Sequence, residues 1–526
     1  MKLAVIVDND ALPRFAREAV DSVRGCDELT VFSCTNTNLK RKAVRHGAYY
    51  ALNLRAVRNP YTRSVPVDGL NKRIARRVSF QSGYEGAWQT LPDAIVDELR
   101  GFDVILKFGM GLLRVPPPER LPAPILSYHH GDPDKFRGRP AGFWEMMKGE
   151  KVMGQIVQAI GNKLDAGRVA AFAETKVFPW SWRATLIESY RHSPMIMDEA
   201  VRNAIAERWL DKPCTGRNYR LPSNSSVARF TLASAGQLAR RVLYGAFVEK
   251  RWQVSVALTG GGDVRGLLTG GNFPGPASWR TLDVPSAYTF YADPFFSSDP
   301  PGILVEALRA STGIGEIVLV DGAHRRVSDA PNHVSYPATF EHGGRQFVIP
   351  EMVACSAPRI FAFENGALRD AGALKVAGDP RILDPTLIEH DGRLYLFGND
   401  VATGANALLL WSAAKLDDEF RPHPASPVRV SPEGARMAGN IIRSEKGLVR
   451  LGQDFTAGYG DGIIGFEIET LTPESYRERL LGRLRFADRR GPHTLNVRGG
   501  EMVFDWYVDR VSPLASFRRL AARLKS

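Results

Sequence analysis

Two sets of polar residues in this sequence have the types and spacing that group-transfer chemistry needs. The first combines Ser127-Tyr128-His129 with Leu164-Asp165-Ala166-Gly167. When an amine attacks an acyl carbon, an oxyanion develops and the amine must lose a proton. A histidine can donate a hydrogen bond to that oxyanion, and a nearby carboxylate can orient the histidine and relay the proton. These segments therefore contain residue types suited to acyl transfer.

The second set consists of two aspartates, Asp293 in ADPFF and Asp384 in LDPTL. Cleavage of a glycosidic bond needs two carboxyl groups across the bond that breaks. Both aspartates precede proline, so the alternative is that they only cap strands through Asx turns. The sequence leaves both interpretations open.

Strands and helices alternate over the first part of the chain, which contains Ser127, His129 and Asp165 and must position them. LAVIVDND, LTVFSC, FDVILKFGM and APILSYHH predict strands, and a helix is predicted over residues 13–23. This pattern is typical of an α/β fold with a mostly parallel sheet, whose chemistry lies at the carboxyl ends of the strands. SYHHGD lies at one such end.

After about Val227 the sequence predicts an apolar and basic helix and then five strand–turn–strand units. Their turns are predicted at Gly302, Gly344, Gly392, Gly447 and Gly500, at intervals of 42 to 55 residues. Glycine supplies the positive φ of a tight hairpin, and this period is typical of a propeller. We therefore predict a five-bladed β-propeller, with an unrelated stack of hairpins as the alternative.

Composition is that of a globular protein with more than one domain. The chain has 526 residues, 44% of them hydrophobic, and a net charge of +12. This charge favours anionic partners, but no nucleic-acid motif accompanies it, so nucleic acid is not favoured. The four cysteines form no pair motif, and neither a signal peptide nor an apolar run of about 20 residues is present. A cytoplasmic protein is expected.

The stretch from Ser127 to Val169 resembles the core signature of the formyltransferase family. The matching pieces are SYH, the FRG of Phe136-Arg137-Gly138, GQI at Gly154, and LDAG. The resemblance implies that His129 stabilises the oxyanion, that Asp165 serves proton removal, and that 10-formyltetrahydrofolate donates the formyl group without a metal. It also implies that the cofactor contacts come from Phe108, Gly109, Met110, Leu112, Arg137 and Gly138. Ser127 departs from the family, which has a catalytic asparagine at this position.

The second half resembles five-bladed propellers of a glycoside hydrolase clan, with Asp293 as general base and Asp384 as the aspartate that tunes the pKa of the acid. The expected general acid is missing, because Ala438 stands near its place, and Glu351 is a candidate substitute. A closer resemblance is to the amino-terminal domain of glucosamine inositolphosphorylceramide transferases, through HVSYP, VIPE, ARMAGNII, GQD and HTLN. It implies a funnel formed by Asp293, Glu351, Asp384, Arg436, Gln453, His493 and Asn496.

The predicted organisation is a formyltransferase-like domain (residues 1–220), a linker helix (221–245), the propeller (246–510) and a basic amphipathic tail (511–526). The tail is a candidate for peripheral membrane contact or for docking on its own propeller. We expect formyl transfer to an amino sugar, carried on a nucleotide or a lipid, in surface glycan assembly, with the propeller binding glycan. The rivals are a propeller that is itself a glycosyl transferase or hydrolase, and a glycan-binding adaptor without catalysis.

Overall fold

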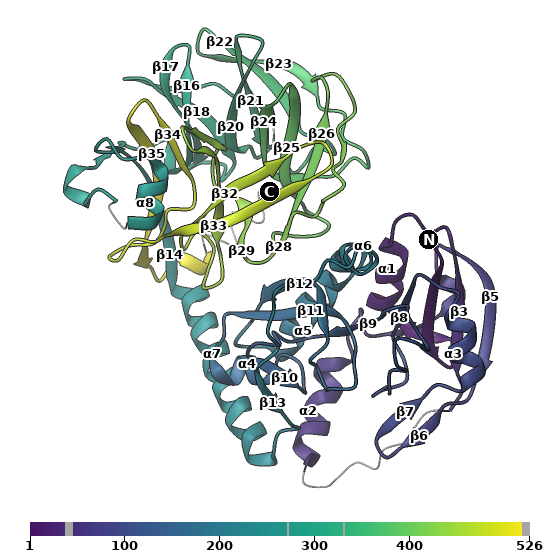
Figure 1. Ribbon diagram of the computed structural model, residues 1–526. Helices are drawn as coiled ribbons and strands as arrows, with labels where there is room; N and C mark the ends of the chain where they lie inside the picture. The colour runs from purple at the N-terminus through teal and green to yellow at the C-terminus, as the bar shows by residue number, and fades with distance from the viewer. Residues whose placement is uncertain (37–45, 271–272, 330–331, 518–526) are drawn as a thin grey trace. The chain divides into compact units, whose positions relative to one another are not determined.

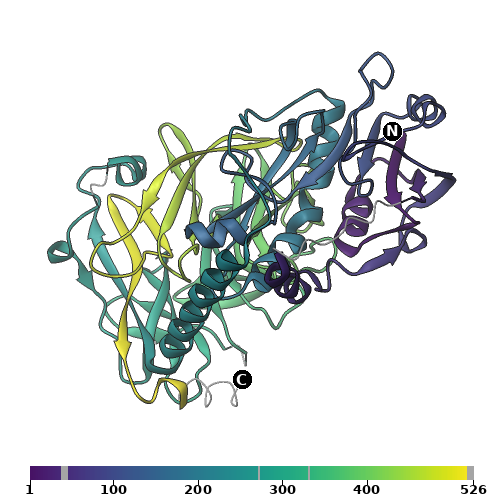
Figure 2. The same cartoon turned by 90° about the horizontal axis from the view of Figure 1, so that it is seen from below.

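The computed structural model describes residues 1–36, 46–270, 273–329 and 332–517. The chain forms two compact units, Met1–Ala239 and Arg240–Ser526. One long helix, α7 (Asn224–Phe247), contains the boundary and lies where the linker helix was predicted (Figure 1 and Figure 2). Residues 518–526, which hold most of the predicted amphipathic tail, lie outside the described residues.

A mixed sheet forms the centre of the first unit. Strands β1, β3, β5, β8 and β9 pair in parallel, and β11 and β12 continue the sheet in antiparallel fashion. From one edge to the other, the main strands are β12 (Arg168–Lys176), β11 (Val152–Ala159), β9 (Ile125–His129), β8 (Val104–Lys107), β1 (Leu3–Asp8), β3 (Glu28–Cys34) and β5 (Arg73–Phe80).

Shorter elements complete this unit. The minor strands are β2 (Ala11–Pro13), β4 (Ser64–Pro66), β6 (Gly83–Glu85), β7 (Trp88–Thr90), β10 (Phe136–Gly138) and β13 (Arg217–Tyr219). The helices are α1 (Arg14–Ser22), α2 (Gly47–Val57), α3 (Asp93–Leu99), α4 (Phe143–Lys148), α5 (Trp182–His192) and α6 (Met197–Ile205).

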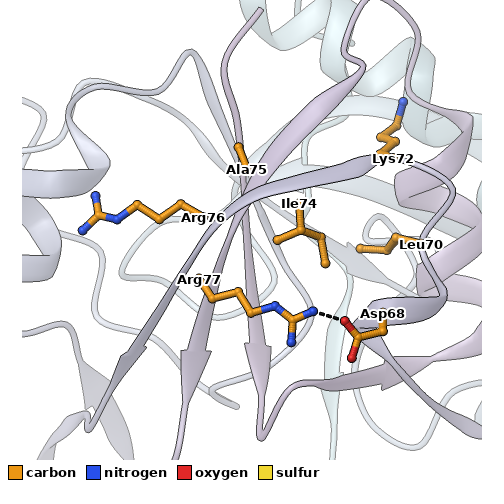
Figure 3. A pocket seen from close by; sticks show the side chains of 7 residues that line it. All are labelled: Asp68, Leu70, Lys72, Ile74, Ala75, Arg76 and Arg77. Atoms are coloured by element: carbon orange, nitrogen blue, oxygen red, sulfur yellow. Dashed lines mark hydrogen bonds and ion pairs between the residues drawn. The ribbon is translucent and has the colours of Figure 1, made fainter.

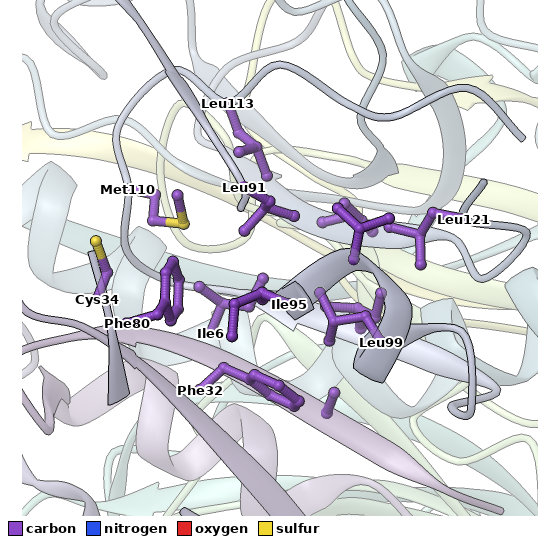
Figure 4. Packing of buried hydrophobic residues seen from close by; sticks show 14 of the residues in the cluster. Ile6, Phe32, Cys34, Phe80, Leu91, Ile95, Leu99, Met110, Leu113 and Leu121 are labelled. Carbon is purple, nitrogen blue, oxygen red and sulfur yellow. The ribbon is translucent and has the colours of Figure 1, made fainter. Parts of the chain in front are cut away.

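The core of the first unit explains why these segments fold as they do. Helix α3 buries Ile95, Val96 and Leu99 on one face, as the spacing of an amphipathic helix requires. These side chains pack with Ile6 and Phe32 from the central strands (Figure 4). The central parallel strands β1, β3 and β8 are buried and mostly apolar, as in a sheet covered by helices, whereas the edge strand β5 is mostly exposed. The predicted α/β class is confirmed.

The second unit is a propeller of five sheets. Four of them follow each other along the chain: β16 (Tyr288–Ser298) to β19 (His324–Arg326), β20 (Ser335–His342) to β23 (Ala367–Ala373), β24 (Ile382–His390) to β28 (Arg429–Val430), and β29 (Glu433–Met437) to β33 (Tyr476–Leu484). Their other strands are β17 (Pro301–Arg309), β18 (Gly315–Val320), β21 (Arg345–Glu351), β22 (Arg359–Glu364), β25 (Arg393–Asp400), β26 (Ala407–Ala413), β27 (Arg421–Pro422), β30 (Ile442–Ser444), β31 (Gly447–Asp454) and β32 (Ile463–Leu471). The predicted five-bladed propeller is confirmed.

The fifth sheet joins the two ends of this unit. Strand β14 (Val248–Leu258) pairs along its whole length with β35 (Glu501–Val511), and β15 (Arg280–Thr281) and β34 (Leu495–Arg498) flank them. Helix α8 (Val264–Gly270) lies between β14 and β15 in the sequence. Because β14 pairs with β35, the first and last long strands of the unit lie in one blade and close the ring.

One predicted turn is wrong. Gly302 lies inside β17. The hairpin turn between β16 and β17 is formed by the preceding residues Asp299 and Pro300. Gly344, Gly392, Gly447 and Gly500 have positive φ angles at or beside their hairpin turns, as predicted. Proline fixes a turn by restricting φ, so the first hairpin needs no glycine there.

Candidate functional site

His129 and Asp165 meet at the end of β9. The side chain of His129 is 8% exposed, and its Nδ1 lies 3.4 Å from Oδ1 of Asp165. Its Nε2 lies 3.0 Å from the carbonyl oxygen of Phe136. A carbonyl can only accept, so the hydrogen resides on Nε2 and Nδ1 faces the carboxylate. The structure thus brings the predicted pair together: the carbonyl of Phe136 orients the imidazole, and Nδ1 faces a carboxylate with which it can share a proton.

Asp165 is held in a fixed position by its backbone and by Gly138. Its φ is +46°, an unusual value for a residue with a side chain, and its Oδ2 accepts the backbone N–H of Gly138 at 2.9 Å. Gly138 itself has φ +87°, and a Cβ there would lie 2.1 Å from the carbonyl oxygen of Tyr219. Gly138 therefore supports the carboxylate, and Arg137 is anchored by its Nε to the carbonyl oxygen of Gly216 at 2.7 Å.

A cavity of about 130 Å³ lies beside this pair. Ser127 and Asp165 line it, together with the apolar side chains of Trp88 and Leu112, whereas His129 does not. Ligand pockets commonly measure roughly 300–1,000 Å³, so this cavity fits the reacting end of a ligand and not a whole folate.

Of the residues predicted to contact the cofactor, only Leu112 lines this cavity. Met110 is buried in the core, and the ring of Phe108 lies 6.3 Å from that of Tyr128. A Cβ on Gly109 would meet Asp8 at 2.6 Å, so the chain passes too close to β1 for any side chain. The loop therefore shapes the cavity mainly through its backbone.

Three polar residues that line this cavity were missed from the sequence: Lys107, Gln158 and Lys163. Lys107 and Gln158 are buried, whereas Lys163 is exposed. Burial lowers the pKa of Lys107 to about 8, although Asp8 acts in the opposite direction. Gln158 pairs with Ser127 across β11 and β9, and its Oε1 accepts the N–H of Gly167. The sequence did contain one signal for Lys107: it is a charged residue at the end of the otherwise apolar strand VILK.

In the propeller, Asp293 and Asp384 occupy equivalent backbone positions. Their φ angles are +46° and +47°, at bulges of β16 and β24, and Tyr336 in β20 matches them with +45°. Such conformations cost about 1–3 kcal/mol each and are found where the surrounding structure fixes them. The Asx-turn interpretation does not describe these positions, because both aspartates lie within buried strands.

Asp384 is the centre of a buried ionic network. Arg436 donates to both of its carboxylate oxygens, from Nε at 2.5 Å and from Nη2 at 3.0 Å, and Gln453 donates to Oδ2 at 2.9 Å. Glu351 accepts the backbone N–H of Asp384 at 2.9 Å. Burial, and next the Asp384 carboxylate, raise the pKa of Glu351 to about 8. Four predicted funnel residues are therefore in contact.

Asp293 belongs to a second network, with His493. Nε2 of His493 lies 3.4 Å from Asp293, and Nδ1 lies 2.5 Å from Asp505. Burial lowers the pKa of His493, but Asp505 and Asp293 outweigh it, so the pKa is raised. Asp505 also accepts three backbone N–H groups, including that of Asp293. Asp505 was missed, because nothing in DWYVDRV separates it from an ordinary strand residue.

The ligand atoms of Asp293, His493 and Asp505 lie within 4.8 Å of one another, a spacing that a metal ion could use. The three N–H groups and the imidazole already occupy the Asp505 oxygens. Hydrogen bonding and ion pairing thus account for this arrangement.

A third buried acid, Glu306 of β17, adjoins Asp293 and was also missed. Burial, followed by the charge of Asp293, raises the pKa of Glu306 well above its ordinary value. Burial thus favours the protonated form of Glu306. Asn496 has a different role: its Nδ2 donates to the carbonyl oxygen of Pro294 and joins two blades.

Aromatic rings lie over the charged groups of the propeller. Tyr459 is 43% exposed, and the guanidinium of Arg436 lies 5.4 Å from its ring centroid. The ring of Trp252 is 4.3 Å from that of His493. Ala438, by contrast, is fully buried in an apolar cluster with Leu451 and Leu495, so an acid at this position would not face these groups.

A hollow of about 440 Å³ on strand β5 offers no comparable chemistry. Its cations have partners: Arg77 pairs with Asp68, as Figure 3 shows, and Arg76 pairs with Glu98. Lys72 donates to the carbonyl oxygens of Val23 and Cys26. These charges are consistent with protection of an edge strand.

Comparison with known proteins connects the propeller to one family. Residues 325–492 match the family described as glucosamine inositolphosphorylceramide transferase 1, N-terminal. Glucosamine inositolphosphorylceramide transferase 1 of Arabidopsis thaliana is 27% identical over 237 residues, which are 42% of this chain and 30% of that protein. The chain thus spans less than a third of the length of this relative. The predicted resemblance of the propeller to this domain is confirmed over the matched residues.

Solved structures resemble each half only distantly. An N-formyltransferase from Helicobacter canadensis, in complex with folinic acid and dTDP-3-aminofucose, covers 44% of this chain and 80% of its own, with 10% identity and a TM-score of 0.27. A GH43_1 enzyme from Xanthomonas citri complexed with xylose covers 38% and 77%, with 14% identity and a TM-score of 0.30. Scores this low carry no argument about function.

The predicted cytoplasmic location is wrong. It rested on cysteine spacing and the lack of a leader, whereas the proteins that share sequence with the propeller are named for inositolphosphorylceramide, a membrane lipid. None of the helices in the described part of the chain is long and apolar enough to cross a membrane.

Proposed function

We propose that the chain transfers a formyl group from a reduced folate to the amine of a sugar, and that its propeller binds the glycan that carries this sugar. The observation that carries the proposal is the His129–Asp165 pair beside the cavity. Nδ1 of His129 at 3.4 Å can exchange a proton with a carboxylate that reaches the cavity. A bound reduced folate would supply the formyl group, with Trp88 and Leu112 against its ring.

Asp165 is the proton acceptor in this proposal. It lines the cavity, and the N–H of Gly138 fixes its orientation. His129 lies behind it, with its ring orientation set by the carbonyl oxygen of Phe136. Proton transfer by such positioned groups typically contributes about 10²–10⁴ in rate.

The relatives support an amino sugar on a lipid as the acceptor. Their name combines glucosamine, which bears an amine, with inositolphosphorylceramide, which bears a phosphate. In the propeller, Arg436 and His493 provide cationic groups, and the carboxylates can accept from sugar hydroxyls. The exposed ring of Tyr459 can pack against a sugar.

A second candidate function is glycosyl transfer by the propeller itself. The observation in its favour is the placement of Glu306 beside Asp293, where burial favours the protonated form of Glu306. An acid and a base in one site are the groups that glycosyl chemistry uses. The two functions differ in product, since only the first yields a formamide.

The deciding experiment incubates the full chain with 10-formyltetrahydrofolate and a panel of amino sugar nucleotides and glucosaminyl lipids. Mass spectrometry then follows the gain of a formyl group. A formylated amine supports the first function. A product with an added or lost sugar and no formyl group supports the second, and absence of both products contradicts both.

Ser127→Asn is expected to leave formyl transfer equal or to raise it. An asparagine amide reaches further than a serine hydroxyl and can donate to the oxyanion, which is the role of the family's residue at this position. The measurement is kcat with the best acceptor. A large loss of kcat in a folded Ser127→Asn protein would contradict this role for the position.

The propeller is expected not to hydrolyse simple arabinosides, xylosides or fructosides. No acid stands at Ala438, and this position is packed among apolar side chains. The measurement is release of nitrophenol from the corresponding aryl glycosides. Turnover that Asp293→Ala abolishes would show that the prediction is wrong.

A further inference from the structure

Three neighbouring strands present a row of polar side chains to the cavity of the first unit. Strands β8 and β9 pair in parallel up to Leu106 and Leu126, and Ser127 pairs with Gln158 of β11. Lys107 follows Leu106 directly, so Lys107, Ser127 and Gln158 lie side by side, on the same face of the sheet. All three line the cavity together with Asp165.

The ammonium of Lys107 has little compensation for its burial. Lys107 is 8% exposed, and its Nζ donates one hydrogen bond, to the carbonyl oxygen of Gly111 at 2.8 Å. Within the described part of the chain it forms no ion pair. A buried ammonium without a carboxylate partner destabilises the fold, and such groups are typical of functional sites. With a pKa of about 8, the group is mostly charged at neutral pH.

Lys163 also lines the cavity, but its side chain is exposed, so water competes for its ammonium. The other candidate donors to an acyl oxygen are weaker or engaged. Nε2 of His129 already donates to Phe136, and His129 does not line the cavity. The hydroxyl of Ser127 is short, and it lies 3.4 Å from the carbonyl oxygen of Lys107. A hydrogen bond from a charged donor is about twice as strong as one between neutral groups.

We propose that the Lys107 ammonium is a catalytic group that donates a hydrogen bond to the oxygen of the acyl group under attack, in place of the amide donor that Ser127 cannot supply. The inference rests on the proposed formyl transfer. The sugar amine forms a C–N bond with the formyl carbon, and the electron pair of the C=O bond moves to the oxygen that Lys107 holds. The proton of the amine passes to Asp165 and then to the donor nitrogen. The electron pair on the oxygen re-forms the C=O bond of the new formamide as the donor's C–N bond breaks.

The test compares wild type with Lys107→Met and Lys107→Gln, and uses Lys72→Met as the matched control. Lys72 is a partly buried lysine of the same unit whose ammonium holds two backbone carbonyls. Three quantities are measured on the full chain: kcat of formyl transfer, the affinity for folinic acid by calorimetry, and the unfolding midpoint. Folinic acid binding needs no turnover, so it tests Lys107 even if no formyl product forms.

Both Lys107 variants are expected to lose at least about 100-fold in kcat, as on removal of an oxyanion donor, and at least about tenfold in affinity for folinic acid. Their unfolding midpoint should stay equal or rise, because a buried charge is removed. Lys72→Met should lower the midpoint and keep both kcat and affinity.

Two results would overturn the inference: wild-type affinity and kcat in the folded Lys107 variants, or a wild type that does not bind folinic acid. A wild type that binds folinic acid through Lys107 but forms no formamide would refute the proposed function and the catalytic role of Lys107, and would leave Lys107 only as a contact of the bound folate.

Discussion

His129→Ala is expected to lower the kcat of formyl transfer by about 100- to 10,000-fold without unfolding the protein. The imidazole lies 3.4 Å from Asp165, so its loss leaves the carboxylate without the group that shares its proton. Asp165→Asn should lower kcat by a similar factor, because the asparagine amide cannot accept the proton of the amine. Steady-state kinetics with the best acceptor, together with circular dichroism, measure both effects.

His130→Gln is the matched control for this prediction. His130 is the next residue along the chain, and its Nε2 lies 3.0 Å from the hydroxyl of Ser193, away from Asp165. Burial, and next the neighbouring His129, lower the pKa of His130 to about 3, so it is neutral and takes no part in proton transfer near pH 7. It should keep wild-type kcat. Equal product from wild type and His129→Ala would refute the assignment of His129.

Arg436→Met is expected to lower the free energy of unfolding of the propeller by about 3–5 kcal/mol. Arg436 donates two hydrogen bonds to Asp384, whose side chain is 3% exposed, and it also contacts Glu351 at 3.3 Å. Its removal leaves the Asp384 carboxylate buried without a cation. Differential scanning calorimetry of the full chain should show the propeller transition at a lower temperature, and glycan binding should be lost.

Arg421→Met provides the comparison for the ionic network. Arg421 pairs with Glu419 at 3.1 Å, but its side chain is 80% exposed, so the pair contributes at most about 1 kcal/mol. Adding Asp384→Asn to Arg436→Met should restore part of the lost stability, because it removes the unpaired charge. If the two arginine variants shift the transition equally, the Asp384–Arg436 pair does not stabilise the propeller.

The order of strands, helices and turns could be predicted from the sequence, because it depends on local signals. Alternating apolar residues and turn residues predicted five hairpins, and four of the five predicted turn glycines have positive φ. In the first unit, the apolar strand ILSYH and the downstream LDAG predicted His129 and Asp165 at strand ends, and the structure brings them to 3.4 Å. Local signals suffice for strands and turns, whereas the pairing of His129 with Asp165 was implied by the resemblance of their motifs to a known family.

The contacts within the two candidate sites were harder to predict from the sequence, because they join segments that lie far apart in the chain. Asp505 was missed although it accepts the N–H of Asp293, which lies 212 residues away in the chain. Lys107 was missed because its neighbours Ser127 and Gln158 come from two other strands. The cofactor contacts predicted in the loop after β8 were Phe108, Gly109, Met110 and Leu112. Of these four residues, only Leu112 lines the cavity.

By itself, the sequence determined the two fold classes, the repeat of the propeller and the segments that hold the polar residues, because hydrophobic period and turn chemistry are local properties. Only the tertiary structure decided that β14 closes the ring on β35 and that Glu306, Glu351 and Lys107 are buried. Burial is a property of the packed chain: it removes water from a charged group and thereby shifts its pKa. For this reason the protonation of the candidate sites follows from the fold and not from the order of residues.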